Sequence, residues 1–172
     1  MGNLLFNPNG RIGRNRFWQG MVILTVLTVL IAAASAMINP FLGILNLAMV
    51  YLYVCVYGKR LHDYGTTAWW VIGVWVASII VGFILNLILG PFFIDEEAIL
   101  IQQEMIERMQ SGDSEGMVEG MRIFSMKVLP LTLLSGVATN AILGAAIGFL
   151  KTEQRENKHG PVPGWGAGDT FG

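Results

Sequence analysis

The side chains best suited to chemistry stand together in one stretch, KRLHDYGTTAWW, at residues 59–70. His62 beside Asp63 could act as a titrating acid–base group, because histidine changes its charge near neutral pH and a carboxylate can orient the ring. Such a pair would suit a lipid-modifying enzyme. A zinc site has less support, since zinc needs three or four such ligands and the other histidine, His159, lies far along the chain.

The same stretch has a purely structural interpretation, in which Asp63 closes a polar latch. Its carboxylate would accept hydrogen bonds from Lys59 or Arg60 about one helical turn earlier, or from Arg11 or Arg14 of the leader, which a helical hairpin would bring close. An arginine–carboxylate pair fixes geometry through charge-assisted hydrogen bonds and needs no reaction. We favour the latch over the acid–base pair and expect no catalytic residues.

A second group of candidate ligands is a set of methionines at one-turn spacing in an acidic segment. They are Met105, Met109, Met117 and Met121. Thioether sulfur suits Cu(I), but methionine is also common on the apolar face of an interfacial helix. No Ser or Cys stands in a motif with a base and an orienting carboxylate. We therefore expect no metal, no cofactor and no enzyme.

The composition indicates which elements position these residues. With 53% hydrophobic and 13% charged residues, the chain is too apolar for an ordinary soluble domain. A membrane span needs about 20 apolar residues, and four uncharged runs lie at or near that length. They are residues 17–38, 41–57, 69–94 and 128–150. The sequence predicts an all-α membrane protein with four transmembrane helices in residues 17–150, a leader at 1–16 and a flexible tail at 151–172.

The distribution of charge predicts the orientation of the spans. Eight of the 11 Lys and Arg residues lie in the leader, at residues 59–60 and in the tail, and the other three lie in the loop 95–127 beside eight carboxylates. By the positive-inside rule, both termini are cytoplasmic and the acidic loop is outside. The loop pattern predicts an amphipathic helix, a break at Ser-Gly-Asp and a second helix near residues 115–126.

The first apolar run also resembles a secretory signal. Arginines precede it, and Ala-Ser-Ala at residues 34–36 imitates a cleavage site. The run is nearer the length of a span than that of a signal peptide, so we expect it to be retained.

Small and polar residues recur at every fourth position in the last two spans. They are Ser78, Gly82, Asn86 and Gly90 in the third span, and Gly136, Asn140, Gly144 and Gly148 in the fourth. Small residues let helix backbones approach, and an Asn amide in hydrocarbon seeks a partner. We expect these two helices to pack along the stripes, with Asn46 as a further inward polar group. Dimerisation through the same faces is the alternative, and a small transporter or channel using the Asn-lined faces is an alternative function.

Three motifs resemble a family of small bacterial membrane proteins, domain-of-unknown-function family 805. G-R-x-x-R-x-x-F-W corresponds to residues 10–18, R-L-H-D-x-G-x-x-x-W-W to residues 60–70, and N-[KR]-[YH]-G-P-x-P to residues 157–163. The resemblance covers nearly the whole chain. It implies a bacterial inner-membrane protein and no established activity. The loop 95–127 is longer than expected for the family.

All three motifs fall on the predicted cytoplasmic side, so we expect one cluster that serves as a structural clasp and as a docking surface. The expected members are Arg11, Arg14, Arg60, His62, Asp63, Trp69 and Trp70. Arg11 and Arg14 would bind carboxylate or phosphate, Asp63 would orient the arginines, and the two tryptophans would anchor the hinge. The expected partners are membrane lipids, above all anionic ones, and a protein partner or a second copy of the chain. Nucleic acid is not expected, because these cations face lipid headgroups.

Overall fold

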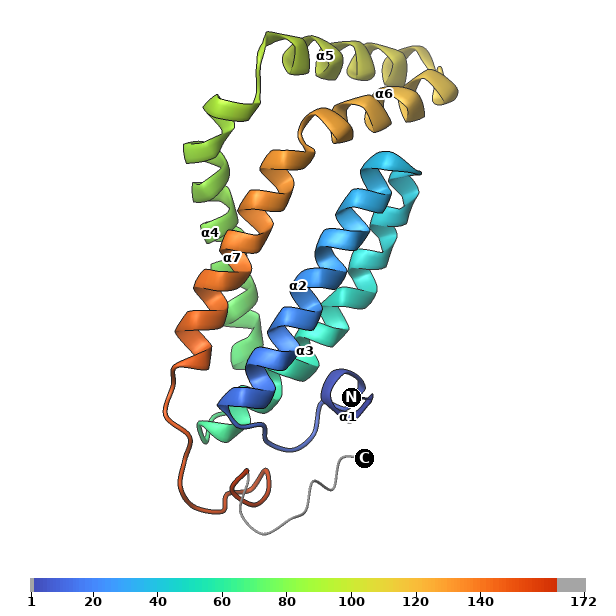
Figure 1. The fold of residues 1–172 in the computed structure, drawn as a ribbon. Helices are drawn as coiled ribbons and strands as arrows, with labels where there is room; N and C mark the ends of the chain where they lie inside the picture. The colour runs from blue at the N-terminus through green and yellow to red at the C-terminus, as the bar shows by residue number, and fades with distance from the viewer. Residues whose placement is uncertain (1, 164–172) are drawn as a thin grey trace. The chain divides into compact units, whose positions relative to one another are not determined.

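The computed structural model describes residues 2–163, and residues 1 and 164–172, which include the end of the predicted tail, lie outside the described residues. The described residues form α-helices and one 3-10 helix, with no named strand among them. The elements are α1 (Gly2–Phe6), α2 (Arg14–Met37), η1 (Pro40–Ile44), α3 (Leu45–Asp63), α4 (Trp70–Phe93), α5 (Glu96–Ser111), α6 (Ser114–Lys127) and α7 (Leu129–Gly148), as Figure 1 shows. The short helix α1 was not predicted.

Four stretches of helix among the described residues are long and apolar enough to cross a membrane. They are Arg14–Met37, Pro40–Asp63, Trp70–Phe93 and Leu129–Gly148. The prediction of an all-α membrane protein with four spans is therefore confirmed. Helix α3 continues beyond the apolar run that ends at Tyr57, because the cations in its last turns find backbone carbonyl acceptors inside the protein.

The predicted loop of two amphipathic helices is also confirmed, and its boundaries follow from local capping. Asp95 caps α5 by accepting from the Ala98 amide at 2.9 Å, and Asp113 caps α6 by accepting from the Gly116 amide at 2.9 Å. Between the helices, Gly112 adopts a left-handed conformation with φ of 77°, which favours glycine because a Cβ is strained there. The Ser-Gly-Asp break therefore ends one helix and starts the next.

The chain divides into two compact units, each of which contains parts of the four long helices. Unit 2 comprises residues 27–46 and 81–139 and includes the turn between α2 and α3 together with the α5–α6 pair. Lys127 at the end of α6 lies 2.9 Å from Asp95 and also pairs with Glu97. These ion pairs connect the end of α6 to the start of α5. The backbone of Gly120 approaches Met105, so one of the four candidate copper ligands packs between helices.

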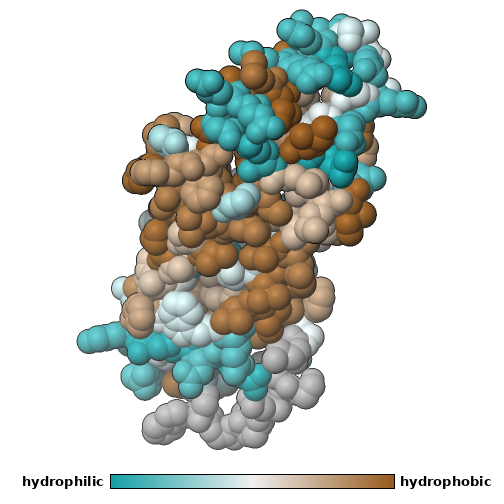
Figure 2. All heavy atoms as spheres, turned by 45° about the horizontal axis from the view of Figure 1, so that its top comes forward, coloured by the Kyte–Doolittle hydropathy of each residue, from teal (hydrophilic) through white to brown (hydrophobic). Residues whose placement is uncertain are grey.

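Unit 1 comprises residues 1–26, 47–80 and 140–172, and it holds the leader, the hinge after α3 and the described part of the tail. Its core is formed by fully buried residues of α2 and α3, among them Phe17, Leu24, Cys55 and Val56. Figure 2 shows hydrophilic residues gathered over the tail end of unit 1 and over the α5–α6 end of unit 2, and hydrophobic residues over the helical parts of each. This surface is typical of membrane helices with polar ends.

The hinge between α3 and α4 depends on Gly65. Its amide donates to the His62 carbonyl at 3.0 Å, and the Thr66 amide donates to the Leu61 carbonyl at 3.1 Å. This is the hydrogen-bond pattern of a Schellman motif at the end of a helix. Gly65 has φ of 84°, and a Cβ there would lie 2.7 Å from a Glu153 carboxylate oxygen. The backbone conformation therefore requires glycine at this position, and a larger residue would also displace the Glu153 carboxylate.

Candidate functional site at the end of helix α3

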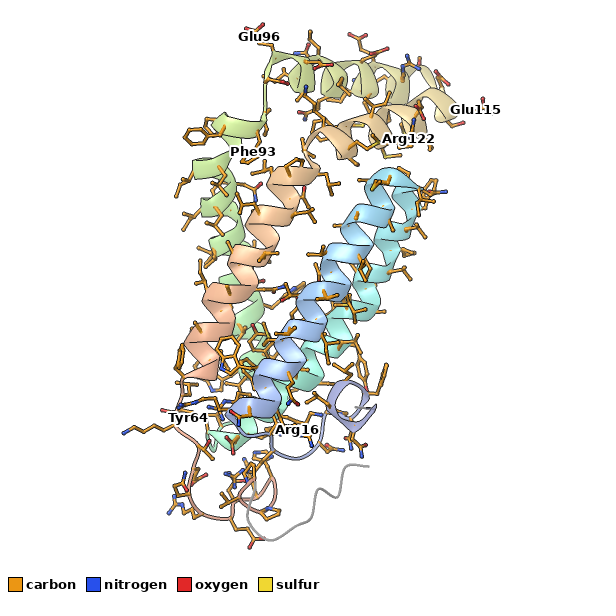
Figure 3. All side chains as sticks on the ribbon, in the orientation of Figure 1. Arg16, Tyr64, Phe93, Glu96, Glu115 and Arg122 are labelled. Carbon is orange, nitrogen blue, oxygen red and sulfur yellow. The ribbon has the colours of Figure 1, made fainter. Side chains whose placement is uncertain are left out.

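Asp63, the last residue of α3, lies at the centre of a buried ion-pair network. Its side chain is fully buried, and the Arg11 and Arg60 side chains that contact it are each 1% exposed. Arg11 Nη2 lies 3.1 Å from Oδ1, and Arg60 Nη1 lies 2.5 Å from Oδ2. The Thr152 hydroxyl also donates to Oδ2, at 2.8 Å. We call these four residues the clasp; Figure 3 labels Tyr64, the residue that follows Asp63 in the chain.

Arg60 connects the end of α3 to the end of α7. Its second terminal nitrogen, Nη2, donates to the carbonyls of Gly148, at 3.0 Å, and Leu150. These carbonyls belong to the last turn of α7 and to the residues after it, where an α-helix carries a partial negative charge. The helix end therefore supplies part of the negative charge that two arginines sharing one aspartate need.

Arg11 connects the leader to the tail. Its Nη1 donates to the carbonyls of Arg155 at 2.9 Å and Gly160 at 3.1 Å, and its Nη2 donates to the Glu153 carbonyl at 2.7 Å. Both terminal nitrogens are thus occupied inside the protein, in addition to the contact with Asp63. Arg11 binds a carboxylate, as the sequence suggested, but it is buried and is not available to a phosphate from outside.

The described part of the tail, residues 151–163, has no helix or named strand but is bonded to the hinge. The Glu153 amide donates to the Asp63 carbonyl at 3.0 Å. The Asn157 side-chain amide donates to the His62 carbonyl at 3.1 Å and to the Glu153 carboxylate at 2.8 Å. Hydrogen bonds from Asn157 and then Arg155 hold the pKa of Glu153 below its usual value. The composition indicated a flexible tail, but these hydrogen bonds attach residues 153 and 157 to the hinge.

His62 and His159 form a stacked pair rather than a dyad with Asp63. Their ring centroids are 3.7 Å apart and their planes differ by 6°. His62 Nδ1 lies 3.1 Å from the Gly10 carbonyl, whereas the Asp63 carboxylate is occupied by the arginines and Thr152. The acid–base pair that the sequence allowed is therefore not formed. Burial, and then the charge of Lys158, lowers the pKa of His159.

Lys59 holds the short helix α1 against α3. Its buried ammonium donates to the carbonyls of Asn3 at 2.5 Å and Leu4 at 2.7 Å. The Tyr51 hydroxyl adds a bond to the Phe6 carbonyl at 2.9 Å. Lys59 is thus a partner of α1 and not of Asp63, so the alternative latch from Lys59 to Asp63 is wrong.

The remaining predicted site residues lie on the surface of unit 1. Arg14, the first residue of α2, is exposed, with its guanidinium carbon 5.9 Å from the centroid of the Phe149 ring. Trp69 and Trp70 are 76% and 64% exposed. The candidate site therefore has two parts, a buried clasp around Asp63 and an exposed rim that includes Arg14 and the two tryptophans.

The small-residue stripe of α7 packs differently from the prediction. Ideal Cβ atoms at Gly144 and Gly148 would meet Trp18 and its neighbours on α2, so these glycines face α2 and not α4. The reason is steric, because a Cβ at Gly148 would lie 2.9 Å from Trp18 Cζ2 and only glycine accommodates the indole ring. Gly82 of α4 does approach α7, with Thr139 Oγ1 3.8 Å from its ideal Cβ.

The three Asn residues expected to face inward have separate partners. Asn140 donates to the Tyr53 hydroxyl at 2.7 Å and to the Thr25 hydroxyl at 3.3 Å, which links α7 to α3 and α2 within unit 1. Asn86 is exposed and donates to the Gly82 carbonyl one turn earlier, and Asn46 is exposed and donates to a carbonyl of η1. The Asn140 amide therefore joins helices, whereas the hydrogen bonds of Asn86 and Asn46 stay within neighbouring turns of the chain.

Metal ligands do not gather in the part of the chain that the structure describes. No group of three or more His, Cys, Asp or Glu residues there is arranged to hold a metal ion. The buried cysteine, Cys55, lies within α3.

Several residues of the site were not predicted from the sequence. Thr152 and Glu153 supply bonds to Asp63, and the carbonyls of Gly148 and Leu150 receive Arg60. Backbone carbonyls give no sequence signal, whereas Asn157 stood in a recognised motif and could have been named.

The helices and the buried clasp together define an integral membrane protein whose leader, hinge and tail meet at one carboxylate. The chain belongs to the family described as "Protein of unknown function (DUF805)", which matches residues 5–161. The resemblance inferred from the three motifs is therefore confirmed, and all three motifs contribute residues to unit 1. Neither a curated protein nor a solved structure matches the chain.

Proposed function

We propose that this protein is a non-enzymatic docking module of the bacterial inner membrane, with both termini in the cytoplasm, that binds a protein partner or anionic lipid at the clasp end. The observation that carries the proposal is the burial of Asp63 between Arg11 and Arg60. A buried pair of this kind fixes geometry and leaves no carboxylate oxygen for chemistry. Its role is to hold the leader and the tail in one arrangement and so to shape the surface around them.

The charge of the two units supports the cytoplasmic orientation. The described residues of unit 1 carry eight cations and three carboxylates, whereas unit 2 carries three cations and eight carboxylates. Loops rich in Lys and Arg stay on the cytoplasmic side of a membrane. The clasp end then faces a leaflet with negative surface potential, which attracts its cations.

The docking surface is the exposed rim and not the clasp itself. Arg11 and Arg60 have their terminal nitrogens bonded inside the protein, so a partner meets Arg14, Trp69 and Trp70 instead. Amphipathic tryptophans at the end of a span suit the membrane–water interface. The surface therefore combines positive charge with aromatic rings beside the bilayer.

Native mass spectrometry of the gently extracted protein tests this function. Wild type is compared with Asp63→Ala and with Glu156→Gln, which removes an exposed carboxylate of the tail outside the clasp. We expect wild type and Glu156→Gln to retain the same protein or lipid, and a still-helical Asp63→Ala to lose it. If all three proteins retain the same bound molecules, or wild type retains none, the docking function is wrong. If Asp63→Ala unfolds, the milder Thr152→Val replaces it in the same comparison.

A further inference from the structure

Most exposed cations of unit 1, unlike the cations of unit 2, lack an ion-pair partner among the described residues; Arg155, which pairs with Glu153, is the exception. In unit 2, Arg108 pairs with Glu104, Arg122 pairs with Glu119, and Lys127 pairs with two carboxylates. In unit 1, three exposed cations have no ion pair with any described residue. They are Arg14, Lys151 and Lys158. An anion from outside the chain can bind these cations without displacing an internal partner.

Two of these cations lie at the depth of the lipid headgroups. Arg14 is the first residue of the span α2, and Lys151 follows the end of the span α7 at Gly148 by three positions. The ends of spans lie in the interfacial layer. Lys158 lies further along the tail, in the turn between Asn157 and Gly160, and therefore provides an internal comparison.

Phe149 contacts Arg14 and lies two residues before Lys151 in the sequence. The Arg14 guanidinium carbon lies 5.9 Å from the Phe149 ring centroid, within the range of a cation–π contact. The ring is 64% exposed and makes an edge contact with Trp18 at 5.9 Å between centroids. An exposed apolar ring under a guanidinium suits the boundary between acyl chains and headgroups, because the ring meets hydrocarbon while the charge meets phosphate.

The guanidinium of Arg14 and the ammonium of Lys151 are suited to bind the phosphodiester of a lipid headgroup. A guanidinium presents a planar set of donors that matches phosphate oxygens, and a lysine ammonium supplies a second, mobile positive charge. A net-anionic phospholipid satisfies this charge, whereas a zwitterionic lipid brings its own cation.

We propose that Arg14, Phe149 and Lys151 form a binding site for the phosphate headgroup of an anionic phospholipid at the clasp end. This inference rests on the proposed docking function and names its occupant. A lipid is favoured over a protein partner because Arg14 and Phe149 lie at the ends of membrane spans, where a bilayer already supplies phosphates and where a soluble protein would have to displace lipid.

The test is native mass spectrometry of delipidated full-length protein titrated with phosphatidylglycerol or phosphatidylcholine. The variants are Arg14→Gln and Lys151→Gln, and Lys158→Gln is the matched control that removes one exposed cation from the same end. We expect each site variant to weaken phosphatidylglycerol binding by about fivefold, and the control to change it by less than twofold. Phosphatidylcholine binding stays weak throughout. All three changed side chains are exposed, so circular dichroism of the variants should match wild type.

Two results overturn the lipid site. If Lys158→Gln weakens binding as much as Arg14→Gln, the attraction is a diffuse charge effect with no defined site. If neither site variant changes the affinity, the headgroup does not bind there. Either result leaves the docking function intact provided that Asp63→Ala still loses a partner that wild type retains, and a retained protein would then identify the occupant as protein.

Discussion

Replacing Asp63 by Asn tests whether the buried ion pairs hold the tail. The amide has nearly the shape of the carboxylate, but it carries no charge and turns an NH2 group toward one of the two arginines. Because the carboxylate is fully buried and Arg11 and Arg60 are each 1% exposed, the change leaves two buried cations without their counter-charge. Breaking a buried pair in this way costs about 3–5 kcal/mol.

The tail provides the route by which the protein relieves that cost. Release of residues 151–163 removes the carbonyls that enclose Arg11 and lets water reach the guanidinium. If the free energy of the tail-bound state rises by about 3 kcal/mol, the population of the released tail increases by roughly 100-fold, because each 1.4 kcal/mol changes an equilibrium tenfold. Removing only the Thr152 hydroxyl, in Thr152→Val, loses its hydrogen bond to Asp63 and the longer one that it accepts from Arg60 at 3.3 Å, at about 0.5–1.5 kcal/mol each. We therefore expect a graded series.

Trypsin cleavage in lipid nanodiscs measures the released population. Lys151, Arg155 and Lys158 are cleavage sites in the tail, and when opening is fast relative to cleavage the rate follows the population of the open form. We expect Asp63→Asn to be cleaved about 100 times faster than wild type, Thr152→Val to be accelerated by a smaller factor, and the control Glu156→Gln to be cleaved at the wild-type rate. Cleavage of Asp63→Asn within twofold of the control would refute the clasp as the element that holds the tail.

Three further changes test the surroundings of the clasp. Because the pKa of His159 is lowered, the bound tail favours the neutral ring; its contribution is complete above the usual pKa of about 6.5 and is lost as the pH falls below it. The ring stacks on His62, the charges of Lys158 and Arg11 oppose its protonation, and the backbone of Thr66 favours it. NMR relaxation should therefore show more mobile tail amides at acidic pH in wild type and a smaller pH step in His159→Gln, which retains His62. Gly148→Ala places a Cβ 2.9 Å from the indole of Trp18 and should lower the free energy of unfolding in detergent by about 1–3 kcal/mol, whereas Gly136→Ala, with open space around it, should lower it by much less. Asn140→Leu loses the bonds to two hydroxyls and should cost about 0.6–2 kcal/mol in the same unfolding assay; no change would mean that those bonds contribute nothing.

The sequence predicts the fold well because the signals for membrane helices are local. Length and apolarity define each span, and Gly112 with Asp113 defines the break between α5 and α6 through backbone conformation and capping. Charge and motif order also bring Arg11, Arg60 and Asp63 to the same end of the spans. Each of these inferences depends on the type of a residue and its position in the sequence, and not on its contacts in the folded protein.

The sequence does not predict which helices and side chains contact one another in the folded protein. Nothing in the composition distinguishes α2 from α4 as the partner of Gly148, because both helices are apolar and the outcome depends on where the Trp18 ring lies. The same holds for His62, whose neighbour in sequence, Asp63, is paired with Arg11 from the leader and with Arg60 one turn earlier in α3. Backbone carbonyls, which bind most of the Arg11 donors, carry no residue identity at all.

The span of sequence joined at Asp63 has a consequence for how the protein is made. Its partners come from the leader, from the same helix and from residues beyond α7, and a chain is synthesised from its N-terminus onward. Arg60 and Asp63 therefore lack Thr152 and the carbonyls of Gly148 and Leu150 until the last helix has been made. A chain truncated before Gly148 lacks the acceptors of Arg60 at the end of α7, so the clasp forms only after α7 and the first residues of the tail have been made.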